Sequence, residues 1–81
     1  MIEVTVSLNA GLRRYRPDLD IGQALPLHIP SGTNLHELLI QILQIPPAEV
    51  AFPMVNGIKC GLDQPLVAGD RVALWPPVAG G

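Results

Sequence analysis

Hydrophobic and polar residues alternate over the first eight positions of the chain. The apolar members are Ile2, Val4, Val6 and Leu8, and the polar residues between them are Glu3, Thr5 and Ser7. A period of two predicts a strand with one buried face and one wet face. The same alternation recurs over residues 25–29, where Pro26 lacks an amide donor. This second strand is therefore expected at a sheet edge, or Pro26 at its beginning.

The period changes after Gly32. Apolar residues then recur at the spacing of one helix face, at Leu35, Leu38, Leu39, Ile42 and Leu43. Asn34 is positioned to cap the first turn, and Glu37 three residues later can complete a capping box. Pro46 and Pro47 follow, so the helix is expected to end near Gln44 or Ile45.

Short apolar segments return in the last third of the chain. Residues 52–55 predict a strand, Asn56-Gly57 suits the positive φ angles of a type I′ hairpin turn, and Ile58-Lys59 begins the returning strand. Residues 63–66 predict a single helical or 3₁₀ turn, and residues 68–70 a tight turn.

The final strand is expected over residues 71–75, with Val72 and Leu74 on one face. Residues 9–22 show no periodicity and predict a long surface connection. The element order predicts an α+β roll with a mixed sheet and one helix on one face. The helical crossover favours a last strand parallel to the first, so that the chain leaves from the middle of the sheet.

Composition narrows the class of partner. The 81 residues are 48% hydrophobic and 15% charged, which indicates one compact domain rather than a disordered chain. A formal net charge of -2 supplies no basic face for a phosphate backbone, so nucleic acid is not an expected partner. Arg13, Arg14 and Arg16 form a small basic cluster, which fits either a solvated loop or contact with an acidic protein surface.

No side chain forms a familiar catalytic or metal-binding pattern. Cys60 is the single cysteine and is expected to be structural or incidental rather than a redox or sulfur-relay thiol, and His28 and His36 lie on different elements. The first residues lack a secretory pattern, and no apolar run is long enough for a membrane span. We therefore expect a cytoplasmic protein without a membrane or metal partner.

The last seven residues read Trp75-Pro76-Pro77-Val78-Ala79-Gly80-Gly81. Two prolines cannot continue a central ladder and favour an extended path away from the sheet. Six residues from Pro76 can span roughly 20 Å. Glycine enters passages too narrow for other residues, so Gly80 and Gly81 fit a tail that threads into a partner; a frayed terminus is the alternative. We predict a domain over residues 1–75 and a tail over residues 76–81.

These residues resemble the ubiquitin-like β-grasp sulfur carriers, closest to the small subunit of molybdopterin synthase. The resemblance rests on Leu12-Arg13, Val55-Asn56-Gly57, Asp63, Pro65-Leu66, Gly69-Asp70, Val72-Ala73 and the Pro76–Gly81 ending. It implies a β-grasp roll of about five strands. It also implies that a partner adenylating enzyme uses ATP and Mg²⁺ to activate the carboxylate of Gly81, and that a sulfur donor converts it to a thiocarboxylate.

The resemblance further implies that the tail enters the large subunit of molybdopterin synthase and gives up sulfur for a dithiolene. The carrier itself binds no cofactor and contributes no catalytic side chain. Trp75, Pro76, Pro77, Val78, Ala79 and Gly80 are then the partner-binding residues. Trp75 is expected on the face opposite Val72 and Leu74, where it either anchors a partner or covers the rim of the core.

The sequence departs from the family pattern at two positions. Asn9 stands where an aromatic residue is common, and Lys59 where an apolar residue can meet a partner. Two alternatives therefore remain: a carrier for another pathway, such as thiamine thiazole or tungsten cofactor synthesis, and a ubiquitin-like conjugation or binding module.

Overall fold

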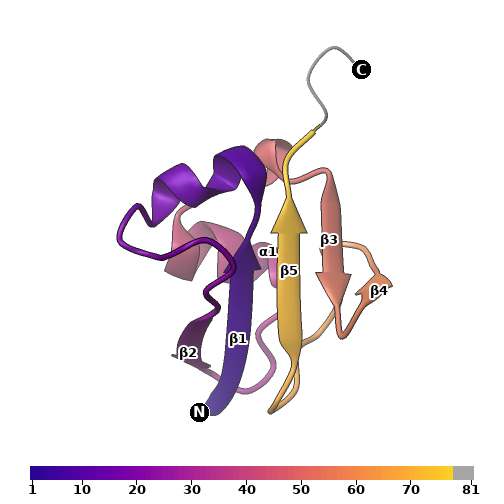
Figure 1. The fold of residues 1–81 in the computed structure, drawn as a ribbon. Coiled ribbons are helices and arrows are strands. Elements are labelled where there is room, and N and C mark those ends of the chain that lie inside the picture. Colours follow the sequence, from indigo (N-terminus) through magenta and orange to yellow (C-terminus); the bar gives the residue numbers. More distant parts are fainter. Residues whose placement is uncertain (78–81) are drawn as a thin grey trace.

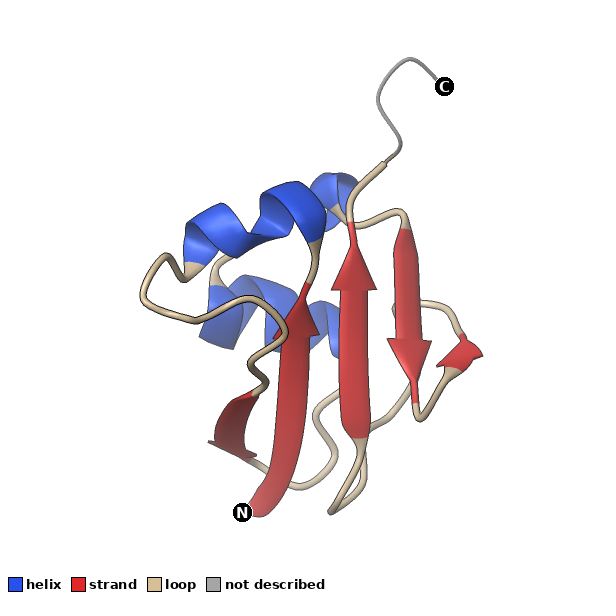
Figure 2. Cartoon of the chain, in the orientation of Figure 1, coloured by secondary structure: helices blue, strands red, loops and turns tan. Residues whose placement is uncertain are grey.

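The computed structural model describes residues 1–77, which form one five-stranded mixed sheet with helices behind and above it (Figures 1 and 2). The strand order is β2-β1-β5-β3-β4. The strands are β1 (Ile2–Leu8), β2 (Leu25–Ile29), β3 (Phe52–Val55), β4 (Ile58–Lys59) and β5 (Arg71–Trp75). This arrangement confirms the predicted α+β roll with one main helix on one face.

The two central strands, β1 and β5, run parallel, with Val6 opposite Val72 and Leu8 opposite Leu74. Strand β2 pairs with β1 in the antiparallel sense and lies at the edge, as the missing amide donor of Pro26 predicted. Strand β3 pairs antiparallel with β5 on the other side. The chain therefore leaves the sheet from its middle strand, also as predicted.

The helix over residues 35–43 begins as α1 (Leu35–Glu37) and continues as the π-helical segment η2 (Leu38–Leu43). Asn34 and Glu37 form the predicted capping box, with donor–acceptor distances of 2.8 and 3.0 Å. Gln44 has a left-handed φ of 58° and ends the helix before Pro46. The end of the helix was predicted correctly, whereas its widening to a π-helix was not.

One hydrophobic core lies between the sheet and the helix. It comprises Val4, Val6, Leu8, Leu12, Ile29, Leu35, Leu38, Leu39, Leu43, Ile45, Val50, Val55, Leu66, Val72 and Leu74. The alternating residues of β1 and β5 contribute one face each, and the helix contributes its apolar stripe. Burying this apolar surface is the main favourable term that stabilises so small a domain.

The prediction of a surface connection over residues 9–22 was wrong in its first half. Residues Ala10–Tyr15 form the 3₁₀ helix η1, and Leu12 is fully buried. Arg14 and Tyr15 both bond to Glu49 in the short 3₁₀ helix η3 (Pro47–Glu49), which fastens η1 across the end of the sheet. A single buried leucine has no periodicity, so the sequence pattern could not reveal it.

The predicted helical turn over residues 63–66 was also wrong. Leu62 and Asp63 form a plain turn, and Pro65 pairs with Asn34 in an isolated bridge. The local hydrogen bond of this segment, from Gln64 N to Gly61 O at 3.2 Å, closes a turn two residues earlier than predicted. Two of its carbonyls bond the start of the helix: Leu35 N donates to Gln64 O at 3.1 Å, and His36 N to Leu62 O at 2.9 Å. Tertiary hydrogen bonds thus take the place of a helical turn over residues 63–66, where Leu66 N also donates to Thr33 O at 2.9 Å.

Both tight turns are confirmed. Asn56 and Gly57 have φ angles of 54° and 81°, the positive pair that a type I′ hairpin requires. Gly69 has a φ of 86° in the turn before β5, and Asp70 N donates to Val67 O at 3.2 Å across it. These turns return the chain to the sheet so that β5 can insert between β1 and β3.

Candidate functional site

The candidate site begins where β5 ends, at the upper end of the sheet in Figure 1. Trp75 is the last residue of β5, and Pro76 and Pro77 follow without regular structure. The predicted site residues Val78, Ala79, Gly80 and Gly81 lie outside the described residues. The described part of the site is therefore residues 74–77, which we call the root of the tail, and the surface around them.

Neighbours on both sides hold this root. Asn9 N and Asn9 Nδ2 donate to the carbonyl of Leu74 at 3.2 and 3.1 Å, and Ala51 N donates to the carbonyl of Trp75 at 2.9 Å. Because β5 lies between β1 and β3, the root is bonded from two directions. The point from which the tail departs is thus defined by the sheet and not by the tail.

An open hollow of about 510 Å³ lies beside the root, on the sheet face away from the helix. Its lining residues are Phe52, Met54, Lys59, Trp75 and Pro76. Trp75 and Phe52 are opposite each other in register, and each is 41% exposed. Exposed aromatic rings next to each other are typical of a surface that binds another protein.

Strand alternation explains why these rings face outward. Val72 and Leu74 are buried in the core, so Ala73 and Trp75 must point to the opposite face. The predicted orientation of Trp75 is therefore confirmed. Phe52 and Met54 share this face on β3 because Pro53 and Val55 are buried.

The sheet face away from the helix, which we call the open face, is polar in its other half. On β1 it carries Glu3, Thr5 and Ser7, and on β2 it carries His28, whose Nε2 lies 3.3 Å from a Glu3 oxygen. The apolar half of the face is thus confined to β5, β3 and β4, next to the tail root. Sequence periodicity placed Trp75 there but did not identify Phe52 and Met54, because only the β3–β5 register brings them together.

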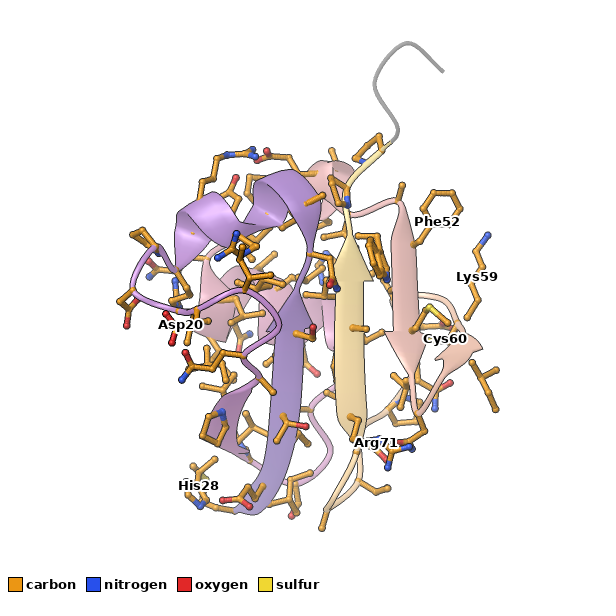
Figure 3. All side chains as sticks on the ribbon, viewed as in Figure 1. Asp20, His28, Phe52, Lys59, Cys60 and Arg71 are labelled. Carbon is orange, nitrogen blue, oxygen red and sulfur yellow. The ribbon has the colours of Figure 1, made fainter. Side chains whose placement is uncertain are left out.

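Lys59 is the charged group at the hollow. Its Nζ lies 4.9 Å from the centroid of the Phe52 ring, and Figure 3 shows both side chains at the same edge of the sheet. Such a cation over a ring face gains from the ring quadrupole. Within residues 1–77, Lys59 takes part in no ion pair, so its charge is available to a partner.

The other reactive or ionisable candidates have structural explanations. Partial burial, and secondarily Asp63, raises the pKa of the Cys60 thiol, which disfavours the nucleophilic thiolate. In the basic cluster, Arg14 bonds Glu49, Arg13 donates to Leu19 O at 3.3 Å and Arg16 to Tyr15 O at 2.7 Å. These side chains stabilise the connection after β1.

A second hollow, of about 410 Å³, lies between the β3–β4 hairpin and the segment before β5. Two of its polar residues bond each other and the backbone: Asn56 Nδ2 donates to Asp70 Oδ1, and Asp70 Oδ2 accepts from Val67 N, both at 2.9 Å. Among residues 1–77 no three side chains of the metal-binding types gather together. Nor does any described helix have the length and apolar character that a membrane crossing needs.

Comparison with solved structures finds the same fold in ubiquitin-like proteins. SAMP1 from Haloferax volcanii is 20% identical, with a TM-score of 0.71, and the match covers 98% of this chain and 99% of that protein. A protein of Pyrococcus furiosus assigned as molybdopterin converting factor, subunit 1, is 23% identical, also with a TM-score of 0.71, over 96% of this chain and all of that one.

No curated protein sequence matches the chain significantly. The model of the ThiS family, by contrast, matches residues 6–81, which includes the end of β1, the other four strands, the helix and the tail. Because this match spans nearly the whole sequence, and the fold is that of the ubiquitin-like β-grasp proteins, the chain belongs to the ThiS family.

Proposed function

We propose that this protein is a sulfur carrier that serves as the small subunit of molybdopterin synthase, with Gly81 as the residue that bears the sulfur. The observation that carries the proposal is the family match through residue 81, combined with a central strand that ends directly at Pro76-Pro77. The similarity to the Pyrococcus furiosus molybdopterin converting factor subunit supports the choice of pathway.

The proposed chemistry follows from the inertness of a carboxylate. A carboxylate is resonance-stabilised and has no good leaving group, so sulfur does not replace its oxygen unaided. A partner adenylating enzyme with ATP and Mg²⁺ would join the carboxylate of Gly81 to AMP and release pyrophosphate. The terminal sulfur of a donor persulfide then attacks the acyl carbon, and AMP leaves. A thiol then attacks the donor's own sulfur in the remaining S–S bond, which forms a disulfide with the donor and releases the thiocarboxylate.

The folded domain contributes the surface that partners recognise, and the tail contributes the length needed to reach an active site. The hollow beside Trp75 and Phe52 offers an apolar surface for both partners, the adenylating enzyme and the large subunit of the synthase. From Pro76, six residues extend at most roughly 20 Å, enough to reach a buried active site from a docked domain. Since ATP is needed for activation, we propose that the protein works in the cytoplasm.

Intact-mass spectrometry tests the proposal. The purified protein is incubated with ATP, Mg²⁺, an adenylating enzyme of the family and a persulfide donor. We expect a mass increase of about 16 Da, because one oxygen is replaced by one sulfur. The same measurement on protein from cells establishes whether Gly81 carries the free carboxylate that the chemistry requires.

Two controls make this mass change specific. Oxidation of Met1, Met54 or Cys60 adds a nearly equal mass, so the change must be located in the C-terminal peptide of a Cys60→Ala variant. Alkylation then labels only a thiocarboxylate, since this variant has no thiol. A variant with one residue added after Gly81 should remain unmodified. Thiocarboxylate formation on that extended variant would refute the proposal.

A second candidate function is conjugation to other proteins. It is favoured by the similarity to SAMP1, because the related Haloferax volcanii structure, 16% identical with a TM-score of 0.71, is described as small archaeal modifier protein 1. Its sign would be stable adducts in which Gly81 is joined to lysine and which resist thiol reductants. Lys59 is the one lysine in this sequence, so self-conjugation through a lysine would be confined to that residue.

The choice of pathway needs a separate experiment. A carrier for thiamine thiazole or for tungsten cofactor synthesis would form the same thiocarboxylate. Complementation of strains that lack each carrier separates these possibilities. We expect rescue of molybdenum enzyme activity and not of thiamine auxotrophy.

A further inference from the structure

We propose that Asn9 is a positioning residue that holds the root of the tail and directs how the tail enters a partner. The mechanical part of this proposal, that Asn9 holds the root, is argued from contacts within residues 1–77 alone. Its kinetic part rests on the proposed function, in which Gly81 must reach the active site of an adenylating enzyme. The two parts are therefore tested by separate measurements.

The side chain of Asn9 bonds strand carbonyls and does not cap the helix that follows it. Asn9 precedes the helix η1, where an asparagine ordinarily accepts a hydrogen bond from the first helical turn, yet no such cap forms here. Instead, Nδ2 donates to Leu74 O at 3.1 Å and lies 3.3 Å from Ser7 O. Both neighbours are carbonyls, so the amide must present its NH₂ group to them.

This contact lies where the ladder between β1 and β5 stops. Asn9 N makes the last backbone bond, to Leu74 O at 3.2 Å. The next donor along β5 would be residue 76, but Pro76 has no amide hydrogen. The Asn9 carbonyl accepts instead from Leu12 N at 3.1 Å. The side chain of Asn9 therefore adds a second bond to the carbonyl nearest this break.

The consequence concerns the direction of the tail. On its β3 side the root is held by Ala51 N, which donates to Trp75 O at 2.9 Å, and on its β1 side by Asn9. Without the Asn9 side chain, the β1 side of the root loses the hydrogen bond from Nδ2 to Leu74 O and keeps only the backbone bond. Trp75, Pro76 and Pro77 then sample more directions, and fewer of these directions lead into a partner.

The mechanical test uses Trp75, the single tryptophan of the sequence, as a probe at the root. Time-resolved fluorescence anisotropy is compared for the wild type, Asn9→Ala and Asn9→Asp. Aspartate has the size of asparagine but offers an oxygen to the two carbonyls. We expect greater local motion of the indole in both variants, and most in Asn9→Asp.

Asn34→Ala is the matched control. It also removes an asparagine side chain that bonds backbone, at the start of the helix, on a different element from the tail root. It should lower stability to a similar extent while leaving the anisotropy decay of Trp75 unchanged. A general loosening of the fold would affect all three variants alike and is thereby distinguished.

The kinetic test measures pyrophosphate release by the adenylating enzyme. The Asn9 variants keep every residue that lines the hollow, so docking is retained, and the greater motion of Trp75 should raise KM by no more than about twofold. By contrast, kcat should fall about fivefold in Asn9→Ala, the effect of one typical hydrogen bond. Unchanged indole motion in Asn9→Asp, or unchanged kcat in both variants, would overturn the proposal. If the wild type itself is not adenylated, the proposed function fails, and the anisotropy alone decides the role of Asn9 at the root.

Discussion

Trp75 shows how one residue can serve both the sheet and the surface. Its backbone carbonyl is the last hydrogen-bond acceptor of β5, bonded by Ala51 N, while its side chain lies opposite Phe52 on the open face. A partner that contacts this ring is thereby close to the place where the tail begins. Binding energy from the hollow can thus be used to position the residues that follow.

We predict that Trp75→Ala and Phe52→Ala each weaken binding to the adenylating enzyme by roughly thirtyfold or more, since buried aromatic anchors contribute about 2 kcal/mol or more at interfaces. Isothermal titration calorimetry measures this. The control is Ile21→Ala, which removes an apolar side chain that is 85% exposed in the connection between β1 and β2. Equal losses for all three variants would contradict a localised docking surface.

At the scale of elements, the β3–β4 hairpin decides where Lys59 lies. The turn at Asn56-Gly57 reverses the chain so that Lys59 pairs with Met54 and its side chain emerges beside Phe52. Glycine is required at position 57 for a conformational reason. Its φ is 81°, and an added Cβ would meet no atom within 4 Å, so the backbone angle is the whole constraint.

We expect Gly57→Ala to lower the free energy of unfolding by about 1–2 kcal/mol, the cost of a left-handed residue with a side chain. Urea denaturation followed by Trp75 fluorescence measures the change. Gly11→Ala is the control, because Gly11 lies in η1 and not among the glycines with positive φ. It should be neutral or slightly stabilising. A Gly57→Ala variant as stable as the wild type would refute the turn assignment.

At the scale of the whole molecule, the folded body and the tail have separate tasks. Within residues 1–77, the residues of the hydrophobic core lie between Val4 and Leu74. The surface that we assign to docking lies beside the root, and the group that we assign to sulfur transfer is at Gly81. Stability and activity should therefore respond to different parts of the sequence.

Deleting residues 78–81 should shift the thermal midpoint by no more than about 3 °C, because the core formed within residues 1–77 is retained, while thiocarboxylate formation is abolished. Differential scanning calorimetry and mass spectrometry measure the two effects. Leu74→Ala is the opposite case: it leaves the tail intact but should cost about 2–5 kcal/mol by opening a cavity in the core. A large loss of stability in the truncated protein would show that the tail packs on the body.

The regular part of the fold was predictable from local pattern. Alternation in β1, β2 and β5, the stripe and capping box of the helix, and the Asn56-Gly57 turn each lie within a few consecutive residues, where one dominant interaction decides the structure. The irregular segments were not predictable in this way. Leu12 is buried, and residues 62–66 bond the start of the helix, because of partners distant in the sequence.

The same division holds for the candidate site. The order of residues alone determined the strands and the position of the main helix, the side of β5 on which Trp75 emerges and the chemical character of the Pro76–Gly81 ending. These depend on the periods of strand and helix, on the missing amide of proline and on the small size of glycine. Only the tertiary structure decided that Phe52, Met54 and Lys59 surround Trp75, and that Asn9 bonds the tail root. Those contacts depend on the register of β3 and β1 against β5, which is set when the core packs.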